Sequence, residues 1–313
     1  MSAVEAQLNK PGFRKATKAS AKLRLALTGP PGSGKTYTSL SIAQGLGKSI
    51  ALIDTEKGSA SKYADIFEFD VLELESFHPQ TYIDAIKSAE QAGYDVLIID
   101  SLSHAWVGKD GALELVDRAK KQKQGGNDFS AWRDITPLQN SLIEAIISAR
   151  LHVIATMRSK TEYVMEQNER GKMTPRKVGM APVQRDGVEY EFDVIGDLNP
   201  DNEMVVTKTR CPQLNGQVIK CAGKGVAETL STWLEGVAVI TAEQSAEIEA
   251  LWKELKTAGH FTSKDQMLAD LIDKTGKSAR NALTETEAAD YVGHLKKLLN
   301  ARLDKSADKE SAR

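Results

Sequence analysis

The chain has 313 residues, which is enough for two domains or for one large domain with an appendage. Its content of 41% hydrophobic and 27% charged residues is close to the globular average and excludes wholesale disorder, collagen and a disulfide-stapled miniprotein. The formal net charge of −2 means that any contact with nucleic acid must come from local basic patches. No apolar run approaches the roughly 18 residues of a membrane helix, and the N-terminus lacks the apolar core of a secretory signal. We therefore expect a cytoplasmic protein with no membrane partner.

The chain begins with a basic segment, residues 1–22, which shows little apolar periodicity. From Lys10 to Arg24 there are six basic residues and no acidic one. Residues 23–236 then alternate apolar runs with amphipathic stretches, which predicts a doubly wound α/β core with a mostly parallel sheet. The expected strands are Leu23–Thr28, Ile50–Asp54, Val96–Asp100 and Leu151–Thr156, and the expected helices are Lys35–Leu46, Pro79–Ala92, Gly111–Lys121 and Phe129–Ala149.

A phosphate-binding loop follows the first expected strand and opens the first expected helix. Its eight residues match the pattern G-x-x-x-x-G-K-[ST]. In such a loop, backbone N–H groups point at phosphate oxygens and the helix N-terminus favours an anion. We expect Lys35 to reach the outer phosphates of ATP and the Thr36 hydroxyl to ligate Mg²⁺. The predicted nucleotide-binding residues are Gly29, Pro30, Pro31, Gly32, Ser33, Gly34, Lys35, Thr36 and the adjacent Tyr37.

Two acidic residues end other strands of the predicted core. Asp100 closes the apolar run Val96–Asp100, and at the carboxyl edge of the sheet it would lie beside the loop and help to hold Mg²⁺. Glu56 follows the strand Ile50–Asp54 and can face the γ-phosphate to orient or deprotonate the attacking water. The alternatives are that Asp100 is a turn residue and Glu56 a solvated loop residue.

These motifs resemble the RecA-like recombinase core. Ile-Asp-Thr-Glu56 is similar to the strand of that family whose glutamate is the catalytic base, and Leu-Ile-Ile-Asp100-Ser101 resembles its Walker B strand. Met204-Val-Val-Thr-Lys208-Thr-Arg210 resembles a late strand whose basic pair reaches the neighbouring subunit's ATP. The resemblance implies that Lys208 and Arg210 are catalytic cations supplied in trans; the alternative is an exposed basic pair that protects an edge hairpin.

The run Val153-Ile-Ala-Thr-Met-Arg-Ser-Lys160 departs from the family. Where the family usually has a glutamine that senses the γ-phosphate, this chain has Thr156, followed by Arg158. We expect both residues to serve in phosphate sensing. More narrowly, the stretch 171–192 looks like phage-encoded RecA-core ATPases, some of which act in single-strand annealing or recombination. The resemblance covers about residues 10–235 and would place the protein in the cytoplasm of a bacterial host.

Two basic segments resemble the family's DNA-binding loops. One spans residues 118–126, and the other spans 158–188, where seven basic residues stand against four acidic ones. The polar part of the second segment, Ser159–Gly187, shows no periodicity and is expected to be a functional loop. Backbone contacts from such loops bind DNA with little sequence preference. The expected DNA-binding residues are Lys120, Lys121, Lys123, Lys160, Lys172, Arg176 and Lys177.

The end of the chain predicts antiparallel strands and then a separate helical domain. Tyr190–Ile195, Glu203–Thr209 and Gln217–Cys221 are expected to extend the sheet. Thr241, Ser263 and Thr284 each precede Gln or Glu by three residues, which is the capping-box pattern, and Gly259 and Gly276 stand where the first two helices should end. We expect a three-helix domain at 240–303, a possible docking site for a single-strand-binding protein, and a disordered tail at 304–313.

The leading prediction is an Mg-ATP-hydrolysing, DNA-stimulated ATPase of recombination or single-strand annealing. Its expected partners are single-stranded DNA and further copies of itself, arranged as an oligomer or filament. One alternative is a P-loop DNA motor or helicase. The other is an ATP-switched regulatory scaffold with little turnover.

Overall fold

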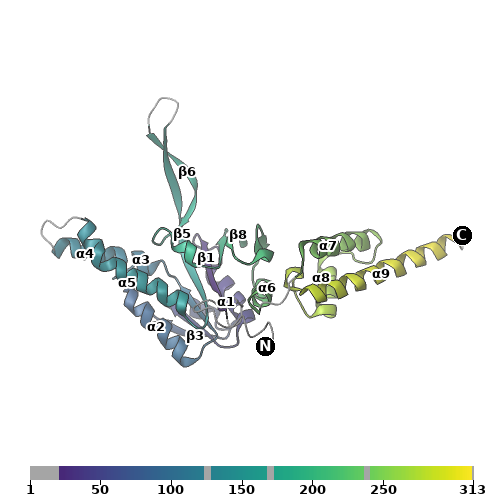
Figure 1. Ribbon diagram of the computed structural model, residues 1–313, viewed down its shortest axis with the longest axis horizontal. Helices are drawn as coiled ribbons and strands as arrows, with labels where there is room; N and C mark the ends of the chain where they lie inside the picture. Colours follow the sequence, from purple (N-terminus) through teal and green to yellow (C-terminus); the bar gives the residue numbers. More distant parts are fainter. Residues whose placement is uncertain (1–20, 123–127, 168–172, 236–239, 312–313) are drawn as a thin grey trace, which may run out of the picture.

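The computed structural model describes residues 21–122, 128–167, 173–235 and 240–311, so most of the basic segment 1–22 lies outside the described residues. Within them, a nine-stranded sheet has the order β3-β2-β4-β5-β1-β7-β8-β9, with β6 paired to β5 alone (Figure 1). The strands are β1 (Arg24–Gly29), β2 (Ile50–Asp54), β3 (Asp70–Glu73), β4 (Val96–Asp100), β5 (His152–Gln167), β6 (Met173–Pro182), β7 (Val194–Leu198), β8 (Glu203–Thr209) and β9 (Val218–Lys220).

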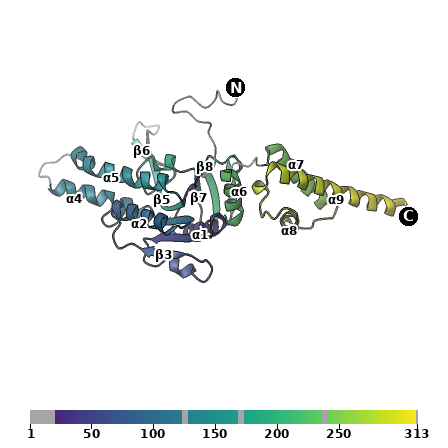
Figure 2. The same ribbon diagram turned by 60° about the horizontal axis from the view of Figure 1, so that its bottom comes forward.

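Helices cover both faces of the sheet (Figure 2). Leu25 and Leu27 of β1 pack with α1 (Lys35–Leu46) and α6 (Lys224–Glu235), and Ala26 packs with α2 (Pro79–Ala92) and α5 (Asp128–Ser148). Side chains of a strand alternate between its faces, so a strand covered on both sides must be apolar throughout. The predicted α/β core with a mostly parallel sheet, followed by C-terminal helices, is therefore confirmed. The short helices α3 (His104–Val107) and α4 (Ala112–Gln122) connect β4 to α5, and short 3₁₀ turns occur at η2 (Ala60–Tyr63), η3 (Val188–Glu191), η4 (Pro212–Leu214) and η5 (Arg280–Ala282).

The parallel strands bring three predicted site residues, Asp100, Thr156 and Arg158, to one edge of the sheet. In the register, Asp54 lies opposite Asp100, and Thr156 lies opposite Leu27, close to the end of β1. Strand β5 lies between β1 and β4, so Thr156 and Arg158 stand between the phosphate loop and Asp100.

The segment predicted as a loop, Ser159–Gly187, instead contains most of a long hairpin. Strand β5 continues beyond the sheet and pairs with β6 from Ser159↔Pro182 to Gln167↔Met173, with a bulge at Glu162/Tyr163. Figure 1 shows this hairpin projecting from the body of the molecule. Its polar sequence lacks the apolar run of a core strand, and the hairpin projects beyond the body of the sheet, so the loop prediction is wrong.

A further prediction about the strands is wrong, and one strand was missed. The expected strand Tyr190–Ile195 is the turn η3 followed by β7, which begins at Val194. Strand β7 pairs parallel to β1, so of the three strands expected to extend the sheet with antiparallel pairing, β8 and β9 do so. Strand β3 was not predicted because it is only four residues long and places just two apolar residues, Val71 and Leu72, between charged ones; all four residues are exposed.

Arg24, the last of the six basic residues counted near the N-terminus, is buried and has a structural role. It is 5% exposed, and its guanidinium donates hydrogen bonds to the backbone oxygens of Leu23, Ile147, Ala149 and Leu151. Burial lowers its pKa, and Asp193 opposes that shift. The side chain thus supplies donors to the carbonyl groups at the C-terminal end of α5, which no helical N–H can satisfy.

The C-terminal region contains α7 (Ala242–Thr257), α8 (Lys264–Thr275) and α9 (Glu285–Ser311), which share an apolar cluster around Leu255 and Leu295. The predicted caps are confirmed: Thr241 and Thr284 form reciprocal bonds with the residues three positions on, and the Ser263 hydroxyl accepts from Gln266 N. Gly259 and Gly276 have positive φ at the helix ends. The last helix continues to Ser311, where a disordered tail was expected from residue 304. No helix among the described residues is long and apolar enough to cross a membrane.

Candidate active site

The phosphate loop joins β1 to α1 in the predicted position. Gly32 and Gly34 have φ values of 78° and 82°, a conformation that favours glycine. A Cβ at Gly29 would lie 2.5 Å from Ser33 Oγ and 2.6 Å from the backbone oxygen of Leu198, so the loop is too close to β7 for any side chain there. The buried Ser33 Oγ has no hydrogen-bond partner among the residues that the structure describes, which fits a loop shaped to receive a polar ligand.

Lys35 is positioned by the loop that it follows. Its Nζ donates to the backbone oxygens of Gly29 at 3.0 Å and Pro30 at 2.8 Å. Burial lowers its pKa, while the charges of Asp100 and Glu56 raise it and that of Arg158 lowers it again. Asp100, Glu56 and Arg158 thus lie near enough to Lys35 for their charges to affect its pKa.

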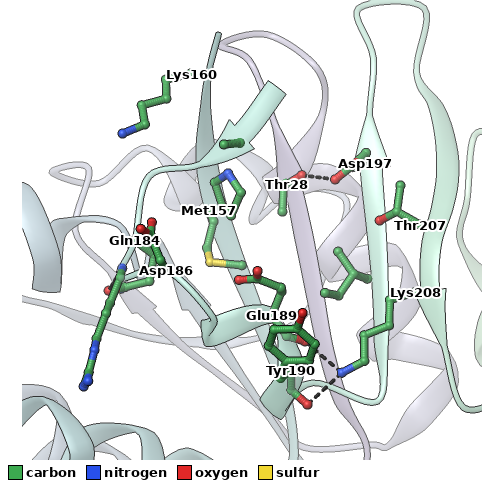
Figure 3. A pocket seen from close by; sticks show the side chains of 14 residues that line it. Thr28, Met157, Lys160, Gln184, Asp186, Glu189, Tyr190, Asp197, Thr207 and Lys208 are labelled. Carbon is green, nitrogen blue, oxygen red and sulfur yellow. Dashed lines mark hydrogen bonds between the residues drawn. The ribbon is translucent and has the colours of Figure 1, made fainter. Parts of the chain in front are cut away.

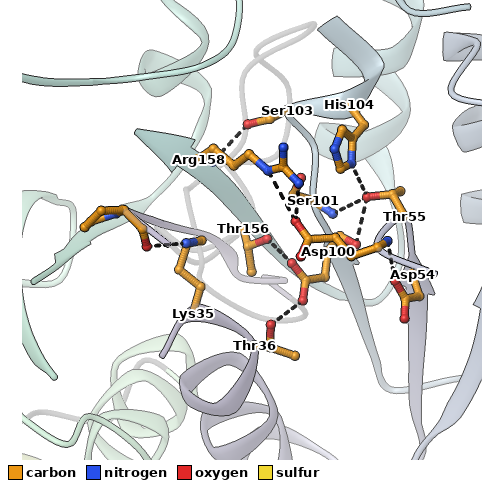
Figure 4. Close-up of polar contacts among 12 residues, drawn as sticks. Lys35, Thr36, Asp54, Thr55, Asp100, Ser101, Ser103, His104, Thr156 and Arg158 are labelled. Carbon is orange, nitrogen blue, oxygen red and sulfur yellow. Dashed lines mark hydrogen bonds and ion pairs between the residues drawn. The ribbon is translucent and has the colours of Figure 1, made fainter. Parts of the chain in front are cut away.

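Asp100 lies at the centre of this site, 5% exposed (Figure 4). Its Oδ2 accepts from Thr36 Oγ1 at 2.6 Å, and its Oδ1 accepts from Thr156 Oγ1. Burial raises the pKa of Asp100, and the two hydroxyl donors lower it. A cis peptide bond links Asp100 to Ser101. Hydroxyl and carboxylate oxygens are the ligands that Mg²⁺ prefers, so Thr36 and Asp100 fit a site for this ion.

Glu56 reaches the same edge and forms an ion pair with Arg158. Arg158 Nη2 and Nε donate to Glu56 Oε1 at 2.7 and 3.3 Å, and the backbone N–H of Arg158 donates to Ser103 Oγ at 2.9 Å. The carboxylate therefore lies within the charged site, beside a cation from the strand that also carries Thr156. The structure brings together Lys35, Thr36, Glu56, Asp100, Thr156 and Arg158.

Tyr37, the last predicted nucleotide-binding residue, is 46% exposed on α1. Its ring contacts those of Tyr63 and Phe67 edge to face, at centroid distances of 5.9 and 5.1 Å. Tyr63 and Phe67 were missed in the sequence because η2 and the residues after it show no periodicity. Phe67 is buried in the core, so Tyr37 packs at the edge of that core next to the phosphate loop.

Lys208 and Arg210 lie apart from this cluster and are held by their own chain. Lys208 Nζ donates to the backbone oxygens of Glu189, Tyr190 and Phe192, and Arg210 Nη1 donates to Asp193 Oδ1 at 2.8 Å. Lys208 lines a cavity of about 940 Å³ between the base of the hairpin and strands β7 and β8 (Figure 3).

The predicted DNA-binding residues fall in two places. Lys120 and Lys121 are in the last turn of α4, and Lys160 is exposed near the base of the hairpin. Arg176 and Lys177 belong to β6, where they pair with Val164 and Tyr163 in the backbone register. Lys123 and Lys172 lie outside the described residues.

Two residues of the site were missed. Thr55 Oγ1 lies 2.6 Å from His104 Nδ1 and accepts from Ser101 N at 2.8 Å, which ties β2 to the turn after β4. No motif points to His104. Thr55 stands inside the run Ile-Asp-Thr-Glu56, in which only Glu56 was given a role, and its position between Asp54 and Glu56 was the one signal for it.

A phosphate loop beside a buried strand-end aspartate, at the carboxyl edge of a mostly parallel sheet, defines a P-loop nucleotide-binding protein. Comparison with family models agrees, because residues 21–225 match the AAA domain model. The chain belongs to this family and carries an AAA-type P-loop ATPase domain, a class that generally uses ATP and Mg²⁺. A search of the curated proteins gives no match.

Proposed function

We propose that this protein is an ATP-dependent DNA-binding protein of recombination or single-strand annealing, similar to phage-encoded RecA-core ATPases, which assembles on single-stranded DNA. The observation that carries the proposal is the continuity of β5. The strand contributes Thr156 and Arg158 to the charged site and then leaves the sheet as one arm of the projecting hairpin. A ligand on the hairpin would act directly on two residues of the site.

The hydrolytic part of the proposal follows from the chain's own groups. Lys35 and Arg158 would offset charge on the outer phosphates, and Glu56 would orient or deprotonate the attacking water. Bound Mg²⁺ would neutralise further charge on the phosphate oxygens. Glu56→Gln should retain ATP affinity but lower turnover by about a hundredfold or more, because an amide cannot accept the proton. Unchanged turnover would remove Glu56 from catalysis.

The DNA part rests on the basic residues of both segments. Lys120 and Lys121 end α4, and the sequence of the hairpin and its flanks has a positive balance. The direct test is the rate of phosphate release with and without a single-stranded oligonucleotide, alongside light scattering of both samples. We expect stimulation and assembly. The proposal would be contradicted if the protein stays monomeric and its rate of phosphate release is the same with and without DNA.

The trans role of Lys208 and Arg210 is proposed from the family resemblance and requires them to leave their present partners. Three carbonyl groups hold Lys208, and a carboxylate holds Arg210. Subunits carrying Lys208→Ala and Arg210→Ala should regain activity when mixed with Glu56→Gln subunits, because each supplies what the other lacks. A mixture as inactive as its parents would count against catalysis across an interface.

The ion pair between Glu56 and Arg158 also favours a second candidate, an ATP-switched scaffold with little turnover. In such a protein the paired carboxylate would seldom act as a base. Glu56→Gln would then leave annealing or assembly intact, while Lys35→Ala would abolish both. Under the leading proposal, Glu56→Gln impairs the ATP-driven cycle itself.

A further inference from the structure

His104 occupies a special position in the site because its ring is held from two sides. It opens α3, directly after the turn that follows β4. The imidazole stacks on Phe77 with a centroid distance of 4.9 Å and an interplanar angle of 22°, and its Nδ1 lies 2.6 Å from Thr55 Oγ1. The stacking on Phe77 fixes the plane of the half-buried ring, and the contact with Thr55 fixes which edge points toward the site.

The Thr55 hydroxyl contacts two backbone groups as well as this ring. It donates to the backbone oxygen of Asp100 at 3.0 Å and accepts from Ser101 N at 2.8 Å. A hydroxyl has one proton and two acceptor lone pairs, so all three contacts are satisfied when His104 Nδ1 is the donor. Burial lowers the pKa of His104, Arg158 lowers it further, and Glu56 and Asp54 oppose the shift. A neutral imidazole has one N–H, and the contacts of Thr55 favour its position on Nδ1.

Thr55 immediately precedes Glu56, whose carboxylate is paired with Arg158. The backbone before that carboxylate is held separately, because Asp54 accepts from the backbone N–H groups of Glu56 and Ala60. The Thr55 N–H donates to the backbone oxygen of Asp100 at 2.8 Å. The peptide that carries Glu56 is therefore held by Asp54, by Thr55 N–H and by the Thr55 hydroxyl, and His104 orients the last of these.

We propose that His104 is a positioning residue for ATP hydrolysis, which acts through the Thr55 hydroxyl to aim the carboxylate of Glu56. This inference rests on the proposed function, since it takes Glu56 as the base. His104 does not bind phosphate in this arrangement. Its loss should lower kcat, because a small misplacement of a catalytic group costs up to about a hundredfold in rate, and it should leave the KM for ATP nearly unchanged.

The test uses the full chain with substitutions matched in shape. His104→Phe keeps the ring that stacks on Phe77 but removes both nitrogens, and we expect kcat to fall about tenfold or more. His104→Asn places an amide nitrogen near the position of Nδ1 and should recover much of that loss. His260→Phe is the control, since that imidazole is exposed in the C-terminal helical region.

A double-mutant cycle separates positioning from a general structural effect. Thr55→Val should lower kcat as His104→Phe does, and the double variant should be no worse than Thr55→Val alone, because His104 acts through the removed hydroxyl. The proposal would be overturned if the fold-loss of kcat in the double variant equalled the product of the two single losses. It would also be overturned if His104→Phe kept the wild-type kcat. Thermal melting identifies any variant that fails to fold, and in that case His104→Asn and Thr55→Ser, which keep the bonding groups, must both retain turnover.

These outcomes are distinct from failure of the proposed function. If the wild-type protein does not hydrolyse ATP, or if Glu56→Gln hydrolyses it at the wild-type rate, the proposed hydrolysis is wrong. The positioning role of His104 is then wrong as well. If turnover depends on Glu56 but is indifferent to His104, only the positioning role is wrong.

Discussion

Replacing Arg158 with glutamine sets two opposing effects against each other. The substitution breaks the ion pair with Glu56 and so frees the proposed base, which would raise the rate. It also removes a cation from the site that Lys35, Asp100 and Glu56 share, which would lower the rate. The sizes of the two effects decide the outcome.

The gain from freeing Glu56 is small. The two side chains are 46% and 36% exposed, and ion pairs of such exposure stabilise by about 0–1 kcal/mol, which corresponds to about a fivefold change at most. The loss is larger, because a cation that offsets charge on the transferring phosphoryl group contributes about 10³-fold or more. We therefore expect Arg158→Gln to lower kcat by at least about a hundredfold.

The assay is phosphate release at saturating ATP. The control is Lys253→Gln, which breaks an exposed ion pair with Glu249 on α7, and it should leave the rate unchanged. A rate for Arg158→Gln that equals the wild type, or rises up to about fivefold, would refute the reasoning. It would mean that Arg158 restrains Glu56 and takes no part in offsetting phosphate charge.

Three further predictions concern other parts of the chain. Lys35→Ala should abolish ATP binding, measured by titration calorimetry, and an unchanged Kd would remove the loop from the site. Arg24→Met should lower the free energy of unfolding by about 3–5 kcal/mol, because it leaves buried carbonyl groups at the end of α5 without donors; urea unfolding measures it, and a loss below about 1 kcal/mol would contradict the capping role. Neutralising Arg176 and Lys177 should reduce the salt slope of DNA binding by about one unit per lost phosphate contact, and an unchanged slope would exclude that strand from the binding surface.

The features that the sequence predicts well depend on residues close together in the chain. The phosphate loop is eight consecutive residues, and the caps of α7 and α9 are pairs three residues apart. The core strands are apolar because both faces of the sheet are covered. Each of these signals is local, so it survives without knowledge of the tertiary structure.

The features that it missed depend on distant partners or on the absence of a buried face. In the sequence Arg24 looks like one more basic residue of the N-terminal segment. Its structural role depends on carbonyl groups more than 120 positions away in the chain. His104 and Thr55 are 49 residues apart and meet only because β2 and β4 are neighbours. The hairpin of β5 and β6 extends beyond the body of the sheet, and its sequence has no apolar pattern that would predict two strands.

The charges of the site bear on the proposal that catalysis spans an interface between subunits. Lys35 and Arg158 are matched by Asp100 and Glu56, so these four groups together bring no net positive charge to a polyanionic ligand. Phosphoryl transfer spreads negative charge over the γ-phosphate oxygens, and positive charge must meet it. A bound divalent ion supplies part of that charge. A cation from a neighbouring subunit would supply more, and it would make turnover depend on assembly, which is the reason for testing Lys208 and Arg210 by mixing subunits.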